Sequence, residues 1–306
     1  MPPILKIATR SSRLAVAQAN SIADEIRRSG FFNGEIQILT LTTRGDVTDG
    51  PLWQSGGKGL FTAELETALR AGRADLAVHS AKDLPAQTPE DLPLIAVPRR
   101  LDPRDALITR AAASLSDIQH GGVVGTSSLR RRAFVHQIRP DLKTVPLRGN
   151  VETRLDRVQN GEISAAVLAM AGLLRGGFVS ERPELKITPL DVETFIPAPG
   201  QGCLAIQAAA GRDDVAQILK NVNHRESHEA LDAEREILRQ LGVSCHSCFA
   251  VHIRKVGRYW QGLAAAARED GNAMIHTEHT GNSPVNLIPL IVDNLVSLGI
   301  KKLLTW

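Results

Sequence analysis

The sequence predicts an α/β protein with two series of alternating strands and helices, followed by a smaller α+β part. Short apolar runs alternate with helical runs over about two thirds of the 306 residues, which is typical of α/β units with largely parallel sheets. Beyond about residue 220, a long charged helix leads into strands that we expect to be antiparallel. A chain of this length can form two or three domains, each with its own core.

The elements follow from hydrophobic periodicity and from helix caps. The first series is predicted to contain strand 4–8, helix 12–28, strand 35–43, helix 59–71 and strand 74–78. The second should contain a strand ending at 123–124, helix 128–137, strand 144–147, helix 151–160 and strand 165–169. The last part should contain helix 226–241, strands 251–254, 262–266 and 274–278, and helix 285–298. Stretches with several Pro or charged residues, 98–105 and 195–202, separate the three parts.

Positive charge comes mainly from arginine. The chain has 27 Arg and 9 Lys, yet its net charge is only +3. A guanidinium offers a planar fork of donors that matches carboxylate and phosphate, whereas lysine offers a point charge. A GC-rich genome, which enriches Arg and Ala together, is the alternative explanation for the total.

The positions of the arginines favour an anion site. Thirteen lie between Arg99 and Arg182, and several stand where a predicted strand ends and a helix begins. In segment 125–132 (GTSSLRRR), backbone N–H groups, hydroxyls and guanidiniums would converge on one anion. Ligands of open α/β sheets bind beyond the carboxyl ends of the strands. For any single arginine, a solvated basic face is the alternative.

The first series repeats this arrangement. Arg10, Ser11 and Ser12 follow the first strand, and a glycine loop at 55–59 precedes a helix but lacks the spacing of a Walker loop. Two lobes of this kind suggest a cleft that holds a polyanion. Nucleic acid is disfavoured because aromatic residues make up only 4% and no nucleic-acid-binding motif is present. A polycarboxylate is at least as good a candidate.

Segment 78–85 (VHSAKDLP) places four functional side chains directly after a predicted buried strand. Asp83, facing a basic cleft, would stay ionised and could stabilise a cation or transfer protons. An ordinary polar turn in which Asp83 caps a helix fits the local pattern equally well.

Two of the three cysteines, Cys245 and Cys248, form a Cys-x-x-Cys pair. Zinc would need further ligands, since Cys203 lies far off in sequence, and a redox pair would need a helix where a strand is predicted. A thiol that acts as a nucleophile or holds a cofactor, and two buried idle thiols, are the other interpretations. We predict no metal site.

The sequence also predicts the compartment. No apolar run reaches the length of a membrane span, and the N-terminus lacks the charged and apolar regions of a secretory signal. Three cysteines do not make a disulfide framework. We therefore expect a cytoplasmic protein without a membrane partner.

Together these segments resemble the porphobilinogen deaminase (hydroxymethylbilane synthase) family over nearly the whole chain. HSAKDLP (79–85) and GTSSLRR (125–131) are specific to that family. The other matching segments are IATRSS (7–12), TRGD (43–46), GGKGLF (56–61), DPRDA (102–106), LRGNV (147–151) with Arg154, and PGQG (199–202). The resemblance implies two periplasmic-binding-protein-like lobes with mixed, mainly parallel sheets and a C-terminal α+β domain. The implied domains are 1–98 with 196–216, then 99–195, and finally 217–306.

The resemblance implies a transferase of tetrapyrrole, porphyrin and heme biosynthesis. Members of the family join four porphobilinogen molecules head to tail, lose ammonia at each step and release hydroxymethylbilane. Their primer is a dipyrromethane cofactor, made from the substrate and held by a thioether to a cysteine. Alignment from Glu234 onward places that cysteine at Cys245. We expect a monomer whose partner is this small molecule and not a nucleic acid.

The resemblance further implies residue roles. Asp83 matches the catalytic aspartate, whose carboxylate would stabilise pyrrole N–H groups and developing positive charge. Each porphobilinogen carries an acetate and a propionate, which suit arginine forks. The positions that match binding or cleft-lining residues are Arg10, Ser12, Lys58, Phe61, Lys82, Ser127, Ser128, Arg130, Arg131, Arg148, Arg154 and Arg175.

The chain departs from the family pattern at the attachment loop. Val243 and Ser244 replace the usual glycine pair before Cys245, and Cys248 and Phe249 follow where a proline is usual. The loop should be less flexible, and the second thiol allows oxidation of Cys245 with Cys248 as a side reaction. Elsewhere, Gln54 stands where the family often has lysine.

Two alternative functions compete with this one. A non-catalytic, two-lobed anion-binding protein would need neither Asp83 nor Cys245 and would be expected to carry an export signal. A zinc- or redox-active Cys-x-x-Cys protein would leave the arginines unexplained.

Overall fold

The computed structural model describes residues 3–43, 45, 61–244 and 247–304. The chain forms two compact units, one made of Met1–Leu101 with Cys203–Asp232 and the other of Asp102–Gly202 with Ala233–Trp306. It passes between the units at residues 101/102, 202/203 and 232/233, the last time within helix α9 (Arg225–Leu241).

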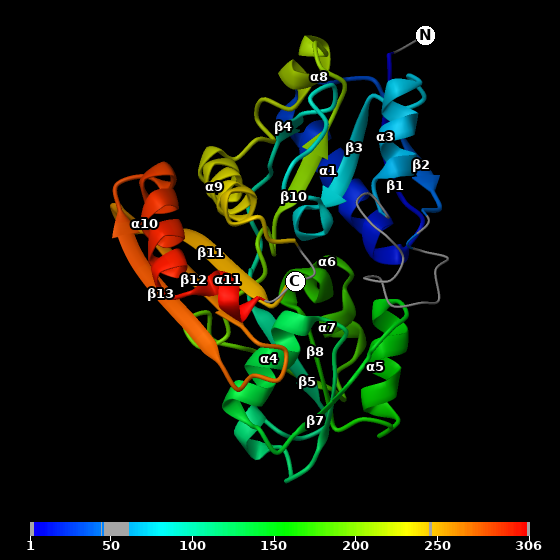
Figure 1. The fold of residues 1–306 in the computed structure, drawn as a ribbon. Helices are drawn as coiled ribbons and strands as arrows, with labels where there is room; N and C mark the ends of the chain where they lie inside the picture. Colours follow the sequence, from blue (N-terminus) through cyan, green and yellow to red (C-terminus); the bar gives the residue numbers. More distant parts are fainter. Residues whose placement is uncertain (1–2, 44, 46–60, 245–246, 305–306) are drawn as a thin grey trace. The chain divides into compact units, whose positions relative to one another are not determined.

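The described part of the first unit is built on a five-stranded mixed sheet (Figure 1). Its strands, in spatial order, are β2 (Glu35–Leu41), β1 (Ile4–Arg10), β3 (Leu76–Ser80), β10 (Leu204–Gln207) and β4 (Leu94–Ala96). β1 runs parallel to β2 and β3, whereas β10 is antiparallel to β3 and β4. The helical segments are α1 (Arg13–Ser29), α3 (Ala63–Arg70), α8 (Asp213–Ile218) and the 3-10 turn η1 (Ala81–Asp83).

Apolar side chains on both faces of this sheet form the core of the first unit. Because successive residues of a strand point to opposite faces, Ile7 and Ala8 of β1 enter different clusters. Ile7 packs in the cluster that contains Ile22 of α1, and Ala8 packs in the cluster that contains Leu65 of α3. Helices therefore cover both faces, as the alternating pattern of the sequence requires.

The second unit contains a five-stranded sheet with the same arrangement. Its strands, in spatial order, are β7 (Lys143–Val145), β6 (Val123–Gly125), β8 (Ala165–Ala169), β5 (Asp105–Thr109) and β9 (Lys186–Pro189). β6 is parallel to β7 and β8, and β5 is antiparallel to β8 and β9. The helical segments are η2 (Leu115–Asp117), α4 (Leu129–Ile138), α5 (Val151–Gln159), α6 (Met170–Arg175) and α7 (Phe178–Glu181).

A three-stranded antiparallel sheet completes the second unit (orange and red in Figure 1). It consists of β11 (Phe249–Val256), β12 (Tyr259–Ala267) and β13 (Met274–Gly281), followed by α10 (Pro284–Ser297) and α11 (Ile300–Leu303). α10 packs on β12 and β13, where a side chain at Gly262 would meet Ile291. Leu263 belongs to the other face and shares a core cluster with Phe134 of α4.

The structure confirms the predicted fold class, with two α/β sheets of mixed, mainly parallel strands and a smaller α+β part. The expected antiparallel strands are β11 to β13. The three-domain division stays a prediction, while the cluster around Phe134 joins the last part to 102–202 in one compact unit. Within the described residues, no helix has the length and apolar character needed to cross a membrane.

Candidate functional site

Four predicted site residues of the first unit lie near one edge of its sheet. β1 and β3 are parallel neighbours, so their carboxyl ends meet at that edge. β1 ends at Arg10, which Ser12 follows after one residue. β3 leads directly into η1, which contains Lys82 and Asp83.

Arg10 and Ser12 make this edge favourable for an anion. Ser12 Oγ accepts a hydrogen bond from the N–H of Ala15 (3.3 Å) and caps α1. The first turn of α1 contains no acidic residue that would offset the positive end of the helix dipole. The half-buried guanidinium of Arg10 lies over the ring of Phe61, 4.2 Å from the centroid, in a cation–π contact.

Asp83 stands on a rigid turn. The N–H of Ala81 donates to the carbonyl of Cys203 (3.1 Å), and the N–H of Leu84 donates to the carbonyl of Ala81 (3.2 Å). Ala81 and Leu84 are buried, whereas Asp83 is exposed. A polar turn is therefore present, but Asp83 is the last residue of this 3-10 turn rather than a helix cap, and it carries an accessible carboxylate beside the end of β3.

The second unit repeats the arrangement at the corresponding edge. β6 takes the place that β1 has in the first sheet, and Ser128 caps α4 by accepting from the N–H of Arg131 (3.4 Å). The hydroxyl of Ser127 donates to the carbonyl of Leu147 (2.9 Å) and accepts from its N–H (3.0 Å). Ser127 thus ties the loop after β6 to the segment that carries Arg148.

Arg130 and Arg131 meet the carboxylate of Asp105 inside the protein. The three residues are 3%, 8% and 0% exposed. Arg131 Nε and Nη2 lie 2.7 Å from Asp105 Oδ1, and Arg130 Nη1 lies 2.8 Å from Oδ2. The carbonyls of Ile196 and Val167 accept further hydrogen bonds from Arg130 (2.7 Å) and Arg131 (3.1 Å).

This cluster holds two cations against one anion. Burial raises the pKa of Asp105, but the charges of Arg130 and Arg131 outweigh it and hold that pKa at about 2. Burial also lowers the pKa of the Arg130 guanidinium. Arg130 Nε is buried without a hydrogen-bond partner among the described residues. A surplus positive charge with an unsatisfied donor remains, which suits a further carboxylate.

The remaining arginines of the predicted set are half-buried. Arg154 Nε donates to the carbonyl of Gly149 (2.9 Å), and Arg148 follows β7 in the same segment. Arg175 is the last residue of the short helix α6, which follows strand β8. Its Nη2 donates to the carbonyl of Gly202 (2.9 Å).

Two predicted residues, Lys58 and Cys245, lie outside the described residues, as does the glycine loop at 55–59. Both described cysteines, Cys203 and Cys248, are buried. Burial raises the pKa of the Cys248 thiol to about 12, so this thiol stays protonated at neutral pH. Within the described ranges, no group of three or more His, Cys, Asp and Glu side chains could hold a metal ion.

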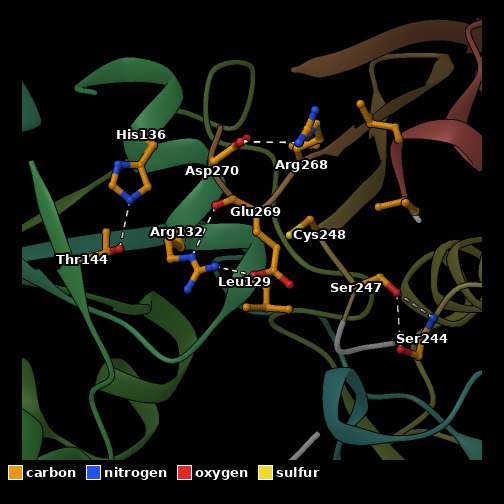
Figure 2. Close-up of a pocket in the computed structure, with 13 residues that line it drawn as sticks. Leu129, Arg132, His136, Thr144, Ser244, Ser247, Cys248, Arg268, Glu269 and Asp270 are labelled. Carbon is orange, nitrogen blue, oxygen red and sulfur yellow. Dashed lines mark hydrogen bonds and ion pairs between the residues drawn. The ribbon is translucent and has the colours of Figure 1, made fainter. Parts of the chain in front are cut away.

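Cys248 lines a cavity of about 770 Å³ within the second unit (Figure 2). The charged side chains of this cavity pair with one another, Arg132 with Glu269 and Arg268 with Asp270. The cavity therefore offers less surplus positive charge to a carboxylate than the cluster around Asp105.

A model of a known family matches residues 5–217, and its description is porphobilinogen deaminase, dipyromethane cofactor binding domain. The chain belongs to the porphobilinogen deaminase family. The resemblance found in the sequence and its dipyrromethane cofactor are thereby confirmed. The matched range ends before Cys245, so the attachment residue stays a prediction.

Named relatives agree with this family assignment. The chain is 44% identical over 282 residues to the porphobilinogen deaminase of Burkholderia orbicola, covering 92% of this chain and 83% of that one. It is 47% identical over 253 residues to that of Burkholderia thailandensis, covering 82% and 75%. Among solved structures, the periplasmic VFT2 domain of Bordetella pertussis BvgS is 17% identical with a TM-score of 0.42, covering 72% of this chain and 86% of that one.

Two residues of the cluster were missed as functional candidates in the sequence. Asp105 and Gln201 stand in the matching segments DPRDA and PGQG, but no role followed from those motifs. The available signal was a charged residue at the start of an apolar run, Asp105-Ala-Leu-Ile-Thr, where a buried strand should be apolar throughout.

Proposed function

We propose that this chain condenses four porphobilinogen molecules head to tail, with loss of ammonia, onto a dipyrromethane primer and releases hydroxymethylbilane. The chain is a transferase of the porphobilinogen deaminase family. The observation that carries the proposal is Asp83, an exposed carboxylate on a rigid turn at the same sheet edge as Arg10 and Ser12.

Binding is assigned to the cationic and hydroxyl groups at the two sheet edges. Acetate and propionate groups of substrate and primer need donors that fit carboxylates, and guanidinium forks, hydroxyls and helix N-termini supply them. In the first unit these are Arg10, Ser12 and Lys82, and in the second Ser127, Ser128, Arg130, Arg131, Arg148, Arg154 and Arg175. Lys58 and Phe61 are proposed as cleft-lining residues, and the ring of Phe61 contacts the Arg10 guanidinium. Ser12 and Ser128 act through helix capping as well.

The described residues fit a dipyrromethane. The group is polyanionic, and the surplus positive charge and unsatisfied Arg130 Nε of the second unit are the counterpart of one carboxylate. When bound, the cofactor supplies the free pyrrole carbon from which the chain grows. Cys245 is the proposed attachment residue, and the raised pKa of Cys248 disfavours that thiol as the alternative.

Asp83 is the proposed catalytic residue. A carboxylate beside a pyrrole ring accepts hydrogen bonds from pyrrole N–H groups and stabilises positive charge that develops when ammonia leaves. It is also able to take up or deliver a proton. Its position on η1, with both ends of the turn hydrogen-bonded, fixes the backbone from which the carboxylate projects.

The proposal includes a monomeric, cytoplasmic protein that acts on a small molecule and has neither nucleic acid nor membrane as a partner. Light scattering of the purified chain tests the first point, because a dimer mass would contradict it. Fractionation of cells that express the untagged chain tests the second, because recovery with membranes would contradict it.

Intact mass spectrometry tests the proposed function. The denatured chain should weigh more than its sequence by one dipyrromethane, and Cys245→Ser should abolish the excess whereas Cys248→Ser keeps it. The bare chain mass after incubation with porphobilinogen, together with no ammonia release, would contradict the proposal. Tight binding of porphobilinogen without turnover would instead support the non-catalytic anion-binding alternative.

A further inference from the structure

The segments DPRDA and PGQG meet at the arginine pair of the second unit. Asp105 is the first residue of β5 and is fully buried. Gln201 is also fully buried, in a turn where its N–H donates to the carbonyl of Ala198 (3.0 Å). Neither residue touches solvent, so both act on a ligand only through other groups.

Gln201 connects Asp105 to Arg131 through its amide group. Its Nε2 donates to the carbonyl of Pro103 (2.7 Å) and to Asp105 Oδ1 (3.1 Å), while its Oε1 accepts from Arg131 Nη2 (3.3 Å). Both hydrogens of the amide and its oxygen are therefore engaged, so this side chain has a single orientation.

The turn that carries Gln201 is anchored from a third element. The N–H of Gly200 donates to Glu234 Oε2 (2.6 Å), and the N–H of Ile253 donates to Oε1 of the same carboxylate (2.8 Å). Glu234 on α9 is fully buried. The position of Gln201 is thus set by α9 and β11 together.

Local structure alone would not bring Arg130 and Arg131 together. They are the second and third residues of α4, where the positive end of the helix dipole and the charge of the neighbour both oppose a cation. The first turn of α4 contains no acidic residue. Asp105 supplies the counter-charge, and the neutral amide of Gln201 accepts from Arg131 Nη2 without adding a second negative charge.

We propose that Asp105 and Gln201 are positioning residues for carboxylate binding, which hold Arg130 and Arg131 as a pair with one surplus positive charge. The inference rests on the proposed function, since carboxylates of substrate and primer are what this charge attracts. A glutamate at position 201 would cancel the surplus while it keeps the size of the side chain, so the neutrality of Gln201 is the sharpest part of the inference.

The test compares Gln201→Glu and Gln201→Met with wild type, all as the purified full chain. We expect the apparent KM for porphobilinogen to rise about tenfold for Gln201→Glu and about threefold for Gln201→Met, with kcat changed less than about threefold. The second readout is the fraction of chains that carry the mass of the cofactor, which should fall in the same order. If Gln201→Glu gives no folded chain, the KM of Gln201→Met alone tests the inference.

The matched control is Asp141→Asn, which removes the carboxylate from the Arg139 pair at the other end of α4. It should leave KM and cofactor content within about twofold of wild type. Folded Gln201 variants with wild-type KM and cofactor content would overturn the inference. It would also be overturned if Asp141→Asn changed KM and cofactor content as much as the Gln201 variants do. Failure of wild type to acquire the cofactor mass would instead defeat the proposed function, so the two failures are distinct.

Discussion

The hydroxyl of Ser127 binds both backbone polar groups of Leu147, at 2.9 Å to the carbonyl oxygen and 3.0 Å to the nitrogen. Leu147 is buried, so Ser127→Ala leaves two backbone groups without this partner and should lower the free energy of unfolding by about 1–3 kcal/mol. The KM for porphobilinogen should rise as well, because Arg148 follows Leu147. Urea unfolding and steady-state kinetics check this prediction. Ser180→Ala, which removes a single exposed hydrogen bond, is the control, and equal effects of the two variants would contradict the tie.

Asp83→Asn should keep the mass of the cofactor and reduce kcat at least about 100-fold, because the amide is unable to stabilise positive charge or exchange a proton in the same way. Ammonia release and intact mass are the two measurements. Asp91→Asn removes another exposed carboxylate of the first unit and should leave both unchanged. A wild-type rate for the Asp83 variant would refute the proposed catalytic role.

Glu234→Ala should lower the free energy of unfolding by about 3 kcal/mol, because it leaves the buried N–H groups of Gly200 and Ile253 without their shared acceptor. Glu234→Gln keeps one amide oxygen and should cost less. Glu236 on the same helix pairs with Arg239 near the surface, so Glu236→Ala should change stability by less than about 0.5 kcal/mol. The midpoints of urea unfolding rank the stability of the three variants. If Glu236→Ala were the least stable of them, the predicted role of Glu234 would be wrong.

Acid should destabilise the second unit through Asp105. Its pKa of about 2 lies below the ordinary 3.8 of the unfolded chain, so its contribution is present above pH 4 and is lost as the pH falls through about 2. The lower pKa in the folded chain corresponds to a contribution of a few kcal/mol to the free energy of unfolding. The contribution of Asp105 is measured by comparing the free energy of unfolding at pH 2 and pH 7 in wild type and in Asp105→Asn. Parallel curves for the two proteins would show that Asp105 does not titrate as described.

Cys248 should resist alkylation at pH 8, where a thiol with a pKa of about 12 is ionised to roughly one part in 10⁴. In chain freed of cofactor, the rapidly alkylated thiol should therefore be Cys245, with Cys203 also protected by burial. Peptide mass spectrometry after brief iodoacetamide treatment identifies the modified residue. Rapid labelling of Cys248 in folded Cys245→Ser would contradict the buried, protonated state.

The sequence predicted those elements whose periodicity is long and whose ends carry caps. Helix 12–28 is observed as α1 (Arg13–Ser29), because Ser12 caps it and Ile22 and Ile26 recur on its buried face. The strands β5 and β10 were missed, since four or five buried residues show no alternation and pair with partners distant in sequence.

The candidate site divides in the same way. Arg10 and Asp83 could be predicted because Arg10 is the last residue of a strand and Asp83 lies three residues beyond one, so the local pattern already places each at a sheet edge. The cluster around Arg131 could not, because Asp105 is 26 residues away and Gln201 is 70 residues away. Their meeting depends on the order of strands in the sheet, which local periodicity does not contain.

The antiparallel strand of each sheet has a consequence for synthesis on the ribosome. Among the described strands of the first unit, β10 is the one that joins β4 to the sheet, and β10 is made more than a hundred residues after β4. A nascent chain that ends before residue 204 therefore exposes the edges of both β3 and β4. The second unit has its β5 at the start of its segment and completes its five-stranded sheet once β9 has emerged. The order of synthesis therefore allows the sheet of the first unit to be completed only when β10 has been made, whereas the five strands of the second unit's sheet lie within one continuous segment.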